Sequence, residues 1–111
     1  MACVRWARGQ GLLVCGQAGG SAYLFGGRTA NALKARGVEP GTPDLLVLEP
    51  GFSGMHGLAV ELKIDDNDLS DAQRAWFTRA RAKGWRCEVV KSLQEFVALV
   101  HEHQSGVIVL D

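Results

Sequence analysis

The chain has 111 residues, with 12 basic and 12 acidic side chains and 47% hydrophobic residues. This composition excludes a disordered chain, no apolar run reaches the roughly 18 residues of a membrane span, and the N-terminus lacks a signal-peptide pattern. Three widely spaced cysteines exclude a disulfide framework and a CxxC metal knuckle, and they are typical of a reducing cytoplasm. We therefore expect one small soluble domain over residues 1–111.

The N-terminal third is rich in glycine and gives weak structural signals. Two short apolar runs, at residues 12–15 and 22–25, favour strands. Residues 29–36 suit a short helix, with Thr29 as a possible N-cap and Gly37 just beyond its end. The glycine pairs of this segment lack the strand and helix that flank a dinucleotide-binding loop, so we interpret them as turns.

The middle of the chain predicts a hairpin. Residues 45–48 form an apolar run typical of a buried strand, and 49–57 contain the glycines and proline of a connecting loop. Residues 58–64 alternate between aliphatic side chains and a second set that includes Glu61 and Lys63. Alternate residues of a strand face opposite sides of the sheet, so this pattern predicts an aliphatic face under a helix and a carboxylate beside an ammonium on the other face.

The C-terminal half predicts helix, strand and helix. A capping box begins a helix at Ser70, and Gly84 ends it. Residues 85–90 alternate as a strand, a second capping box opens a helix at Ser92, and residues 107–110 form a last strand or an ordered tail. This order of elements implies one mixed sheet with helices packed on its faces.

One group of residues suggests chemistry. Asp44 begins the first hairpin strand, and Glu61 and Lys63 lie on the strand expected to pair with it. Two converging carboxylates are hard oxygen ligands for Mg²⁺ or Mn²⁺, and a lysine beside them could orient a water or accept its proton during phosphodiester hydrolysis. The same residues also fit a bland interpretation, in which Glu61 and Lys63 form a solvated pair and Asp44 belongs to a turn.

Three sequence blocks around these residues stand in a recognisable order. They are Gly37-Val38-Glu39-Pro40-Gly41-Thr42-Pro43-Asp44-Leu45, Ala59-Val60-Glu61-Leu62-Lys63 and Leu69-Ser70-Asp71-Ala72-Gln73. Together they resemble the VRR-NUC family, a branch of the PD-(D/E)xK nuclease superfamily. The strand and capping box after Lys83-Gly84-Trp85 look like the family's C-terminal half, and the resemblance covers about residues 24–100.

The resemblance implies an α/β fold with a restriction-endonuclease-like core, in which a small mixed β-sheet is flanked by helices. It implies that Asp44 and Glu61 bind Mg²⁺ or Mn²⁺, that the backbone carbonyl of Leu62 is a third metal ligand, and that Lys63 is the catalytic lysine. It also makes Gln73 the family's active-site glutamine, although the capping box by itself already accounts for a glutamine there.

The implied activity is that of a metal-dependent DNA endonuclease, acting as a homodimer on branched DNA such as four-way (Holliday) junctions in the cytoplasm of a bacterial or phage-infected cell. One departure stands against it. Family members usually have an upstream helix whose glutamate completes the metal site, and no acidic residue precedes Glu39. The upstream helix thus looks to be missing. This departure leaves a catalytically impaired nucleic-acid-binding or assembly domain as an alternative, beside an unrelated α/β module.

Other side chains have weaker signals. Residues 1–38 contain basic but no acidic side chains, and Arg28, Lys34 and Arg74 are candidates to contact a nucleic-acid backbone, against a simple role in the solvated surface. We expect Trp76 and Trp85 to form core or dimer contacts rather than base-stacking platforms. Phe77 is likewise expected to form core or dimer contacts, and Cys87 is expected to be a core thiol. The three histidines, His56, His101 and His103, are expected at the surface.

Overall fold

The computed structural model describes residues 1–16, 39–63 and 68–107. Within these ranges the elements are α1 (Ala2–Gly9), β1 (Val14–Gly16), β2 (Leu45–Val47), β3 (Leu58–Leu62), α4 (Asp71–Ala82), β4 (Arg86–Val90) and α5 (Leu93–Ser105). The strand expected at 22–25, the helix expected at 29–36, and residues 108–110 of the expected C-terminal strand lie outside the described residues. None of the described helices is long and apolar enough to cross a membrane.

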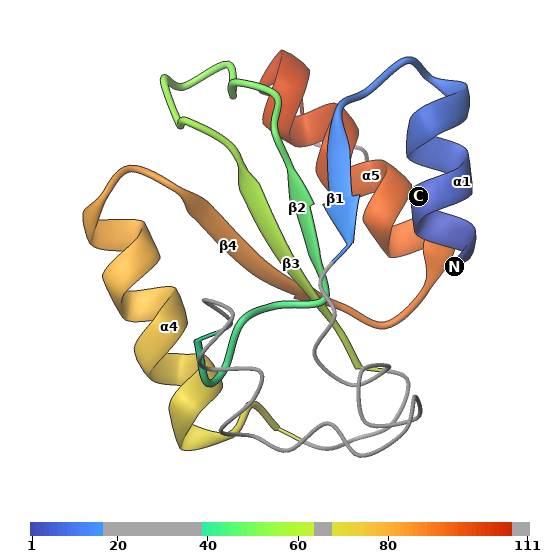
Figure 1. The fold of residues 1–111 in the computed structure, drawn as a ribbon. Helices are drawn as coiled ribbons and strands as arrows, with labels where there is room; N and C mark the ends of the chain where they lie inside the picture. The colour runs from blue at the N-terminus through green and yellow to red at the C-terminus, as the bar shows by residue number, and fades with distance from the viewer. Residues whose placement is uncertain (17–38, 64–67, 108–111) are drawn as a thin grey trace.

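The strands form one mixed sheet in the order β1-β2-β3-β4 (Figure 1). β2 pairs antiparallel with both β1 and β3, and the predicted hairpin is confirmed, with Leu45 opposite Val60 and Val47 opposite Leu58. β4 instead runs parallel to β3. A parallel pair needs a crossover connection, and α4 supplies it between the two strands.

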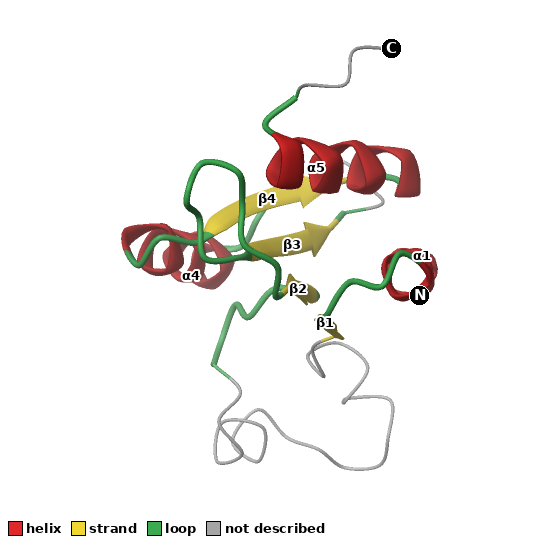
Figure 2. Ribbon diagram, turned by 90° about the horizontal axis from the view of Figure 1, so that it is seen from above, coloured by secondary structure: helices red, strands yellow, loops and turns green. Residues whose placement is uncertain are grey.

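Helices cover both faces of the sheet (Figures 1 and 2). On one face α1 and α5 pack against the aliphatic side chains of the strands, and Phe96 and Val100 are fully buried there beside Leu58 and Val60. On the other face, Phe77 and Ala80 of α4 pack against Ala59 of β3 and Cys87 of β4, and these four buried residues form a smaller cluster. The predicted division of β3 into two faces is therefore confirmed, as is the core position of Cys87, which is 1% exposed.

A helix forms at the N-terminus, where the sequence predicted none. In α1, Cys3 and Ala7 are buried one turn apart, and the Trp6 ring packs edge-on against Phe96 at 5.9 Å between ring centroids. Met1 stands at its N-cap without a capping side-chain hydrogen bond. An eight-residue helix without a cap is marginal by itself in water, and its stability comes from packing on α5 and the sheet.

The predicted capping box at Ser70 is confirmed, whereas at Ser92 only half of one forms, because the Glu95 carboxylate accepts the Lys91 N–H and not the Ser92 N–H. The Gln73 backbone N–H donates to the Ser70 hydroxyl, and the Ser70 N–H donates in return to the Gln73 side-chain oxygen. At α5 the Glu95 N–H donates to the Ser92 hydroxyl at 3.1 Å. These caps satisfy backbone donors that a helix leaves free at its first turn, so they fix where α4 and α5 begin.

One histidine was wrongly expected at the surface. His103 is only 2% exposed, and its Nε2 lies 2.8 Å from the carbonyl oxygen of Glu49. It follows Phe96, Leu99 and Val100 along the buried side of α5, so its position continues the apolar stripe. The His103 carbonyl also accepts a hydrogen bond from the Phe52 N–H at 2.7 Å. His103 therefore holds the β2–β3 loop against α5, whereas His56 and His101 are exposed as expected.

Candidate active site

The register of the hairpin places Asp44 beside Glu61. Leu45 and Val60 are partners in the antiparallel pair, so Asp44 and Glu61 follow as the next opposed positions, just before β2 begins. The Leu62 N–H donates to Asp44 Oδ2 at 2.8 Å, which extends the ladder through a side chain. The structure thus brings together the two acidic residues that the sequence singled out.

Glu61 is a buried carboxylate with an unsatisfied oxygen. The residue is 5% exposed, and its Oε2 has no hydrogen-bond partner. The pKa of Glu61 is raised from its ordinary 4.5 to about 8, mainly by burial. A hydrogen bond with the Asp44 carboxyl group and the negative charge of Asp44 raise this pKa further, whereas the positive charge of Lys63 lowers it. The alternative interpretation, in which Glu61 and Lys63 form a solvated surface pair, is therefore wrong.

This arrangement fits a divalent cation. A buried carboxylate oxygen without a partner is costly, and two carboxylates that share one site repel each other when both are ionised. A hard cation would satisfy the Glu61 oxygen and remove the repulsion from Asp44. Within the described part of the chain, no group of three or more His, Cys, Asp or Glu side chains could hold a metal ion. Backbone oxygen and water would have to complete the coordination of a metal bound by this pair.

The end of β3 supplies that backbone oxygen and a cation. In an extended strand the N–H and C=O of one residue point toward the same neighbour, and the Leu62 N–H points at Asp44. The Leu62 carbonyl consequently belongs to the same edge. Lys63 follows, half-buried, and its backbone N–H donates to the Val90 carbonyl at 2.9 Å. Its side chain shares the strand face of Glu61, two residues away.

Gln73 lies at the start of α4, where its side-chain oxygen accepts the Ser70 N–H at 2.8 Å.

The loop before Asp44 contacts the first turn of this helix at Gly41. A Cβ on Gly41 would overlap the Ala72 carbonyl, and the Gly41 φ of +81° is in the left-handed region. Close backbone contact therefore joins the Pro-Gly loop to the first turn of α4, and the amide nitrogen of Gln73 is the part of its side chain outside the capping box.

Of the three basic residues predicted to contact phosphate, the structure describes Arg74. Arg28 and Lys34 lie outside the described residues. Arg74 is exposed and forms two surface ion pairs, with Asp68 at 3.8 Å and with Asp71 at 3.4 Å. Exposed ion pairs of this kind contribute little, so Arg74 could exchange either carboxylate for a phosphate.

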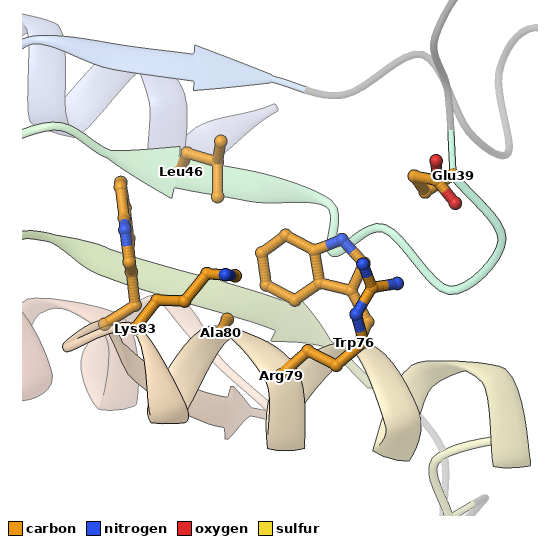
Figure 3. A pocket seen from close by; sticks show the side chains of 7 residues that line it. Glu39, Leu46, Trp76, Arg79, Ala80 and Lys83 are labelled. Atoms are coloured by element: carbon orange, nitrogen blue, oxygen red, sulfur yellow. The ribbon is translucent and has the colours of Figure 1, made fainter.

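The structure contains a pocket that the sequence did not predict. It is formed between α4 and the sheet, has a volume of about 300 Å³, and is lined by two tryptophans, Trp76 and Trp85, with Arg79 and Lys83 (Figure 3). Phe77 is buried as expected, but both tryptophans are only half-buried. The i, i+3 and i+7 spacing of Trp76, Arg79 and Lys83 on one helix was the available signal.

The fold and the site together define the class of protein. A four-stranded mixed sheet flanked by helices, with paired carboxylates at the hairpin and a lysine two residues after one of them, is an α/β restriction-endonuclease-like core of nuclease type. The family model of the VRR-NUC domain matches residues 19–94, and the chain belongs to this family.

A solved structure agrees with that assignment. A chain described as "VRR_NUC domain protein" superposes with a TM-score of 0.58 at 25% sequence identity, covering 78% of this chain and 75% of that chain. Among the curated proteins, none matches this sequence. The predicted family and fold class are confirmed, and the VRR-NUC domain implies DNA as the substrate.

Proposed function

We propose that this protein is a Mg²⁺- or Mn²⁺-dependent DNA endonuclease that hydrolyses phosphodiester bonds at the Asp44–Glu61 site. The observation that carries this proposal is the buried Glu61 Oε2, which has no partner and lies beside a second carboxylate. A fold does not keep an unpaired buried carboxylate for stability, because the desolvation of the charged form destabilises it. A bound divalent cation would account for the pair.

Each residue of the site has a role in such a reaction. Asp44, Glu61 and the Leu62 carbonyl would hold the metal, which when bound lowers the pKa of water and neutralises charge on the phosphate. Lys63 would orient the attacking water or hold the proton that it releases, and its positive charge would stabilise the developing negative charge on the phosphate. The Gln73 amide nitrogen would donate a hydrogen bond to water or to a phosphate oxygen.

The finer substrate preference rests on the family relationship. We infer that the enzyme acts on branched DNA such as four-way junctions and that it works as a homodimer. A domain of 111 residues offers little surface for gripping two arms of a branched duplex, and a second copy would supply it. Arg28, Lys34 and Arg74 are the proposed backbone contacts.

Cleavage assays test the proposal. The protein is incubated with four-way-junction DNA and with linear duplex, in Mn²⁺, in Mg²⁺ or in EDTA. We expect metal-dependent cleavage of the junction, and a loss of about a hundredfold or more in Asp44→Asn, Glu61→Gln and Lys63→Met. The exposed Asp68→Asn is the matched control and should retain activity. Cleavage that persists in EDTA, or that survives all three substitutions, would contradict the proposal.

Metal binding provides a second readout that needs no DNA. Calorimetric titration with Mn²⁺ should show a site that is lost in Glu61→Gln and retained in Asp68→Asn. If the protein instead binds junction DNA without any metal-dependent cleavage, the alternative holds, and the domain is a nucleic-acid-binding module on a nuclease fold.

A further inference from the structure

The pocket between α4 and the sheet has the chemistry of a binding site. Trp76 and Arg79 reach it from α4, and Lys83 reaches it from the C-cap of that helix. Leu46 reaches it from β2, and Glu39 lies on the loop at its far side (Figure 3). Trp85, just before β4, completes the apolar wall. Among the described residues that line it, the pocket of about 300 Å³ therefore combines two flat aromatic rings with two cations and one carboxylate.

The pocket opens on the sheet face that bears the candidate active site. Leu46 follows Asp44 by two residues, so their side chains share one face of the sheet, about 7 Å apart along the strand. On β3 the same face carries Ala59, which packs against α4, and then Glu61. A ligand in the pocket would consequently lie on the same face of the sheet as the two carboxylates, although neither carboxylate lines the pocket.

The cations at this pocket are not used by the fold. The Arg81 guanidinium donates to the Cys87 carbonyl at 2.7 Å and lies 5.3 Å from the centre of the Phe77 ring, so Arg81 has a structural role. Arg79 and Lys83, by contrast, form no side-chain hydrogen bond or ion pair with any described residue, and both are exposed.

We propose that this pocket binds an unpaired nucleobase of the DNA substrate, stacked on Trp76, with Arg79 and Lys83 contacting the phosphates that flank it. Indole rings stack on bases of any sequence, and neighbouring cations follow the backbone. The described lining has two cations against one carboxylate, and this excess of positive charge complements the anionic backbone rather than a neutral apolar partner. This inference takes from the proposed function only that the substrate is DNA. It adds that the bound DNA has a base that is not paired.

The test measures binding in EDTA, so it does not depend on cleavage. Trp6 lies on the other face of the sheet against Phe96, and Trp6→Phe leaves the two pocket tryptophans as the only tryptophans, which are excited selectively over the single tyrosine. This protein is titrated with a short oligothymidylate and with an abasic oligonucleotide of the same length, which keeps the phosphates and lacks the bases. We expect the base-containing strand to quench the fluorescence and to bind about 5- to 100-fold more tightly than the abasic strand.

Substitutions in the same background separate the two contributions. Trp76→Leu keeps an apolar side chain and should remove most of the preference for the base-containing strand, while Trp76→Phe should restore part of it. Arg79→Gln with Lys83→Gln should weaken both strands alike and reduce the salt dependence of binding. Circular dichroism and urea unfolding confirm that each variant is folded.

The outcomes distinguish this inference from the proposed function. Equal affinity for the two strands, or a base preference unchanged in Trp76→Leu, would overturn the inference even if the protein cleaves DNA. Pocket tryptophans that respond to neither strand would overturn it as well. Asp44→Asn should keep the base preference. If the unsubstituted protein shows this preference but no metal-dependent cleavage, the pocket is supported and the proposed endonuclease is contradicted.

Discussion

The Asp44 carboxylate accepts a hydrogen bond from the Leu62 N–H at 2.8 Å, although the two residues are 18 positions apart. One oxygen of Asp44 is therefore held by the strand that carries Glu61. The separation of the two acidic side chains follows from the register of the β2–β3 hairpin, and a slip of one residue would turn Glu61 to the opposite face of the sheet.

This contact predicts different consequences for two substitutions of Asp44. Asp44→Asn keeps an oxygen that can accept the Leu62 N–H, whereas Asp44→Ala leaves that partly buried donor without a partner. We expect Asp44→Ala to be less stable than Asp44→Asn by about 1 kcal/mol or more in urea unfolding with EDTA present. Both variants should lose Mn²⁺ binding. Equal stability of the two would show that the hydrogen bond is not formed in solution.

Glu61 predicts an unusual pH dependence of the metal-free protein. Its pKa is raised from 4.5 to about 8 in the folded state, mainly because the side chain is buried. Between these values the folded state binds one more proton than the unfolded chain. This extra proton on Glu61 contributes to the free energy of unfolding. Its contribution is complete below about pH 4.5 and is lost as the pH rises through 8, at about 1.4 kcal/mol per pH unit.

Glu61→Gln removes this titration and provides the comparison. In EDTA, the difference in unfolding free energy between Glu61→Gln and the unsubstituted protein should grow steadily from pH 5 to pH 8 in favour of glutamine, because only the natural carboxylate must ionise in a buried site. Saturating Mn²⁺ should reverse the order at pH 8 by binding the carboxylate. Parallel stability curves for the two proteins would indicate that Glu61 is solvated.

Local signals explain which parts of the fold could be predicted from the sequence. The alternation in residues 58–64 and the capping boxes at Ser70 and Ser92 depend on neighbours in the chain, and β3, α4 and α5 form where these signals stand. α1 was missed although buried Cys3 and Ala7 and the exposed arginines follow a helical period, since so short a helix depends on packing against α5 and the sheet for its stability. His103 was misplaced because a polar residue in an apolar stripe is buried only when a partner such as the Glu49 carbonyl is present.

The candidate site shows the same division. Strand alternation placed Glu61 and Lys63 on one face, but whether that face is solvated depends on α4, which comes from a later part of the chain. The pocket could not be predicted either, because Leu46, Trp76 and Trp85 come from three separate segments. Periodicity identifies which side of each element is apolar, but not which of those sides remain partly uncovered.

Gly41 allows a test of how the loop before Asp44 is held. Gly41 and Gly54 have similar φ values, +81° and +88°, but a Cβ on Gly54 would meet no atom within 4 Å, whereas one on Gly41 would overlap the backbone of α4. Gly54→Ala should therefore cost only the conformational strain of about 1–2 kcal/mol. Gly41→Ala should cost at least about 1 kcal/mol more in urea unfolding, and it should weaken Mn²⁺ binding by displacing Asp44. Equal losses in the two variants would mean that the loop does not pack on α4.

His103 should stabilise the fold without taking part in the site. It is buried, with its Nε2 2.8 Å from the Glu49 carbonyl, and it lies on the opposite face of the sheet from Glu61. His103→Phe keeps an aromatic ring but cannot make this hydrogen bond, so the partly buried Glu49 carbonyl loses its partner at a cost of about 1–3 kcal/mol. The exposed His101→Ala is the matched control and should change stability by less than about 1 kcal/mol. Below its own unfolding transition, His103→Phe should bind Mn²⁺ as the unsubstituted protein does. A loss of metal affinity in the folded variant would show that the β2–β3 loop transmits its position to Asp44 and Glu61.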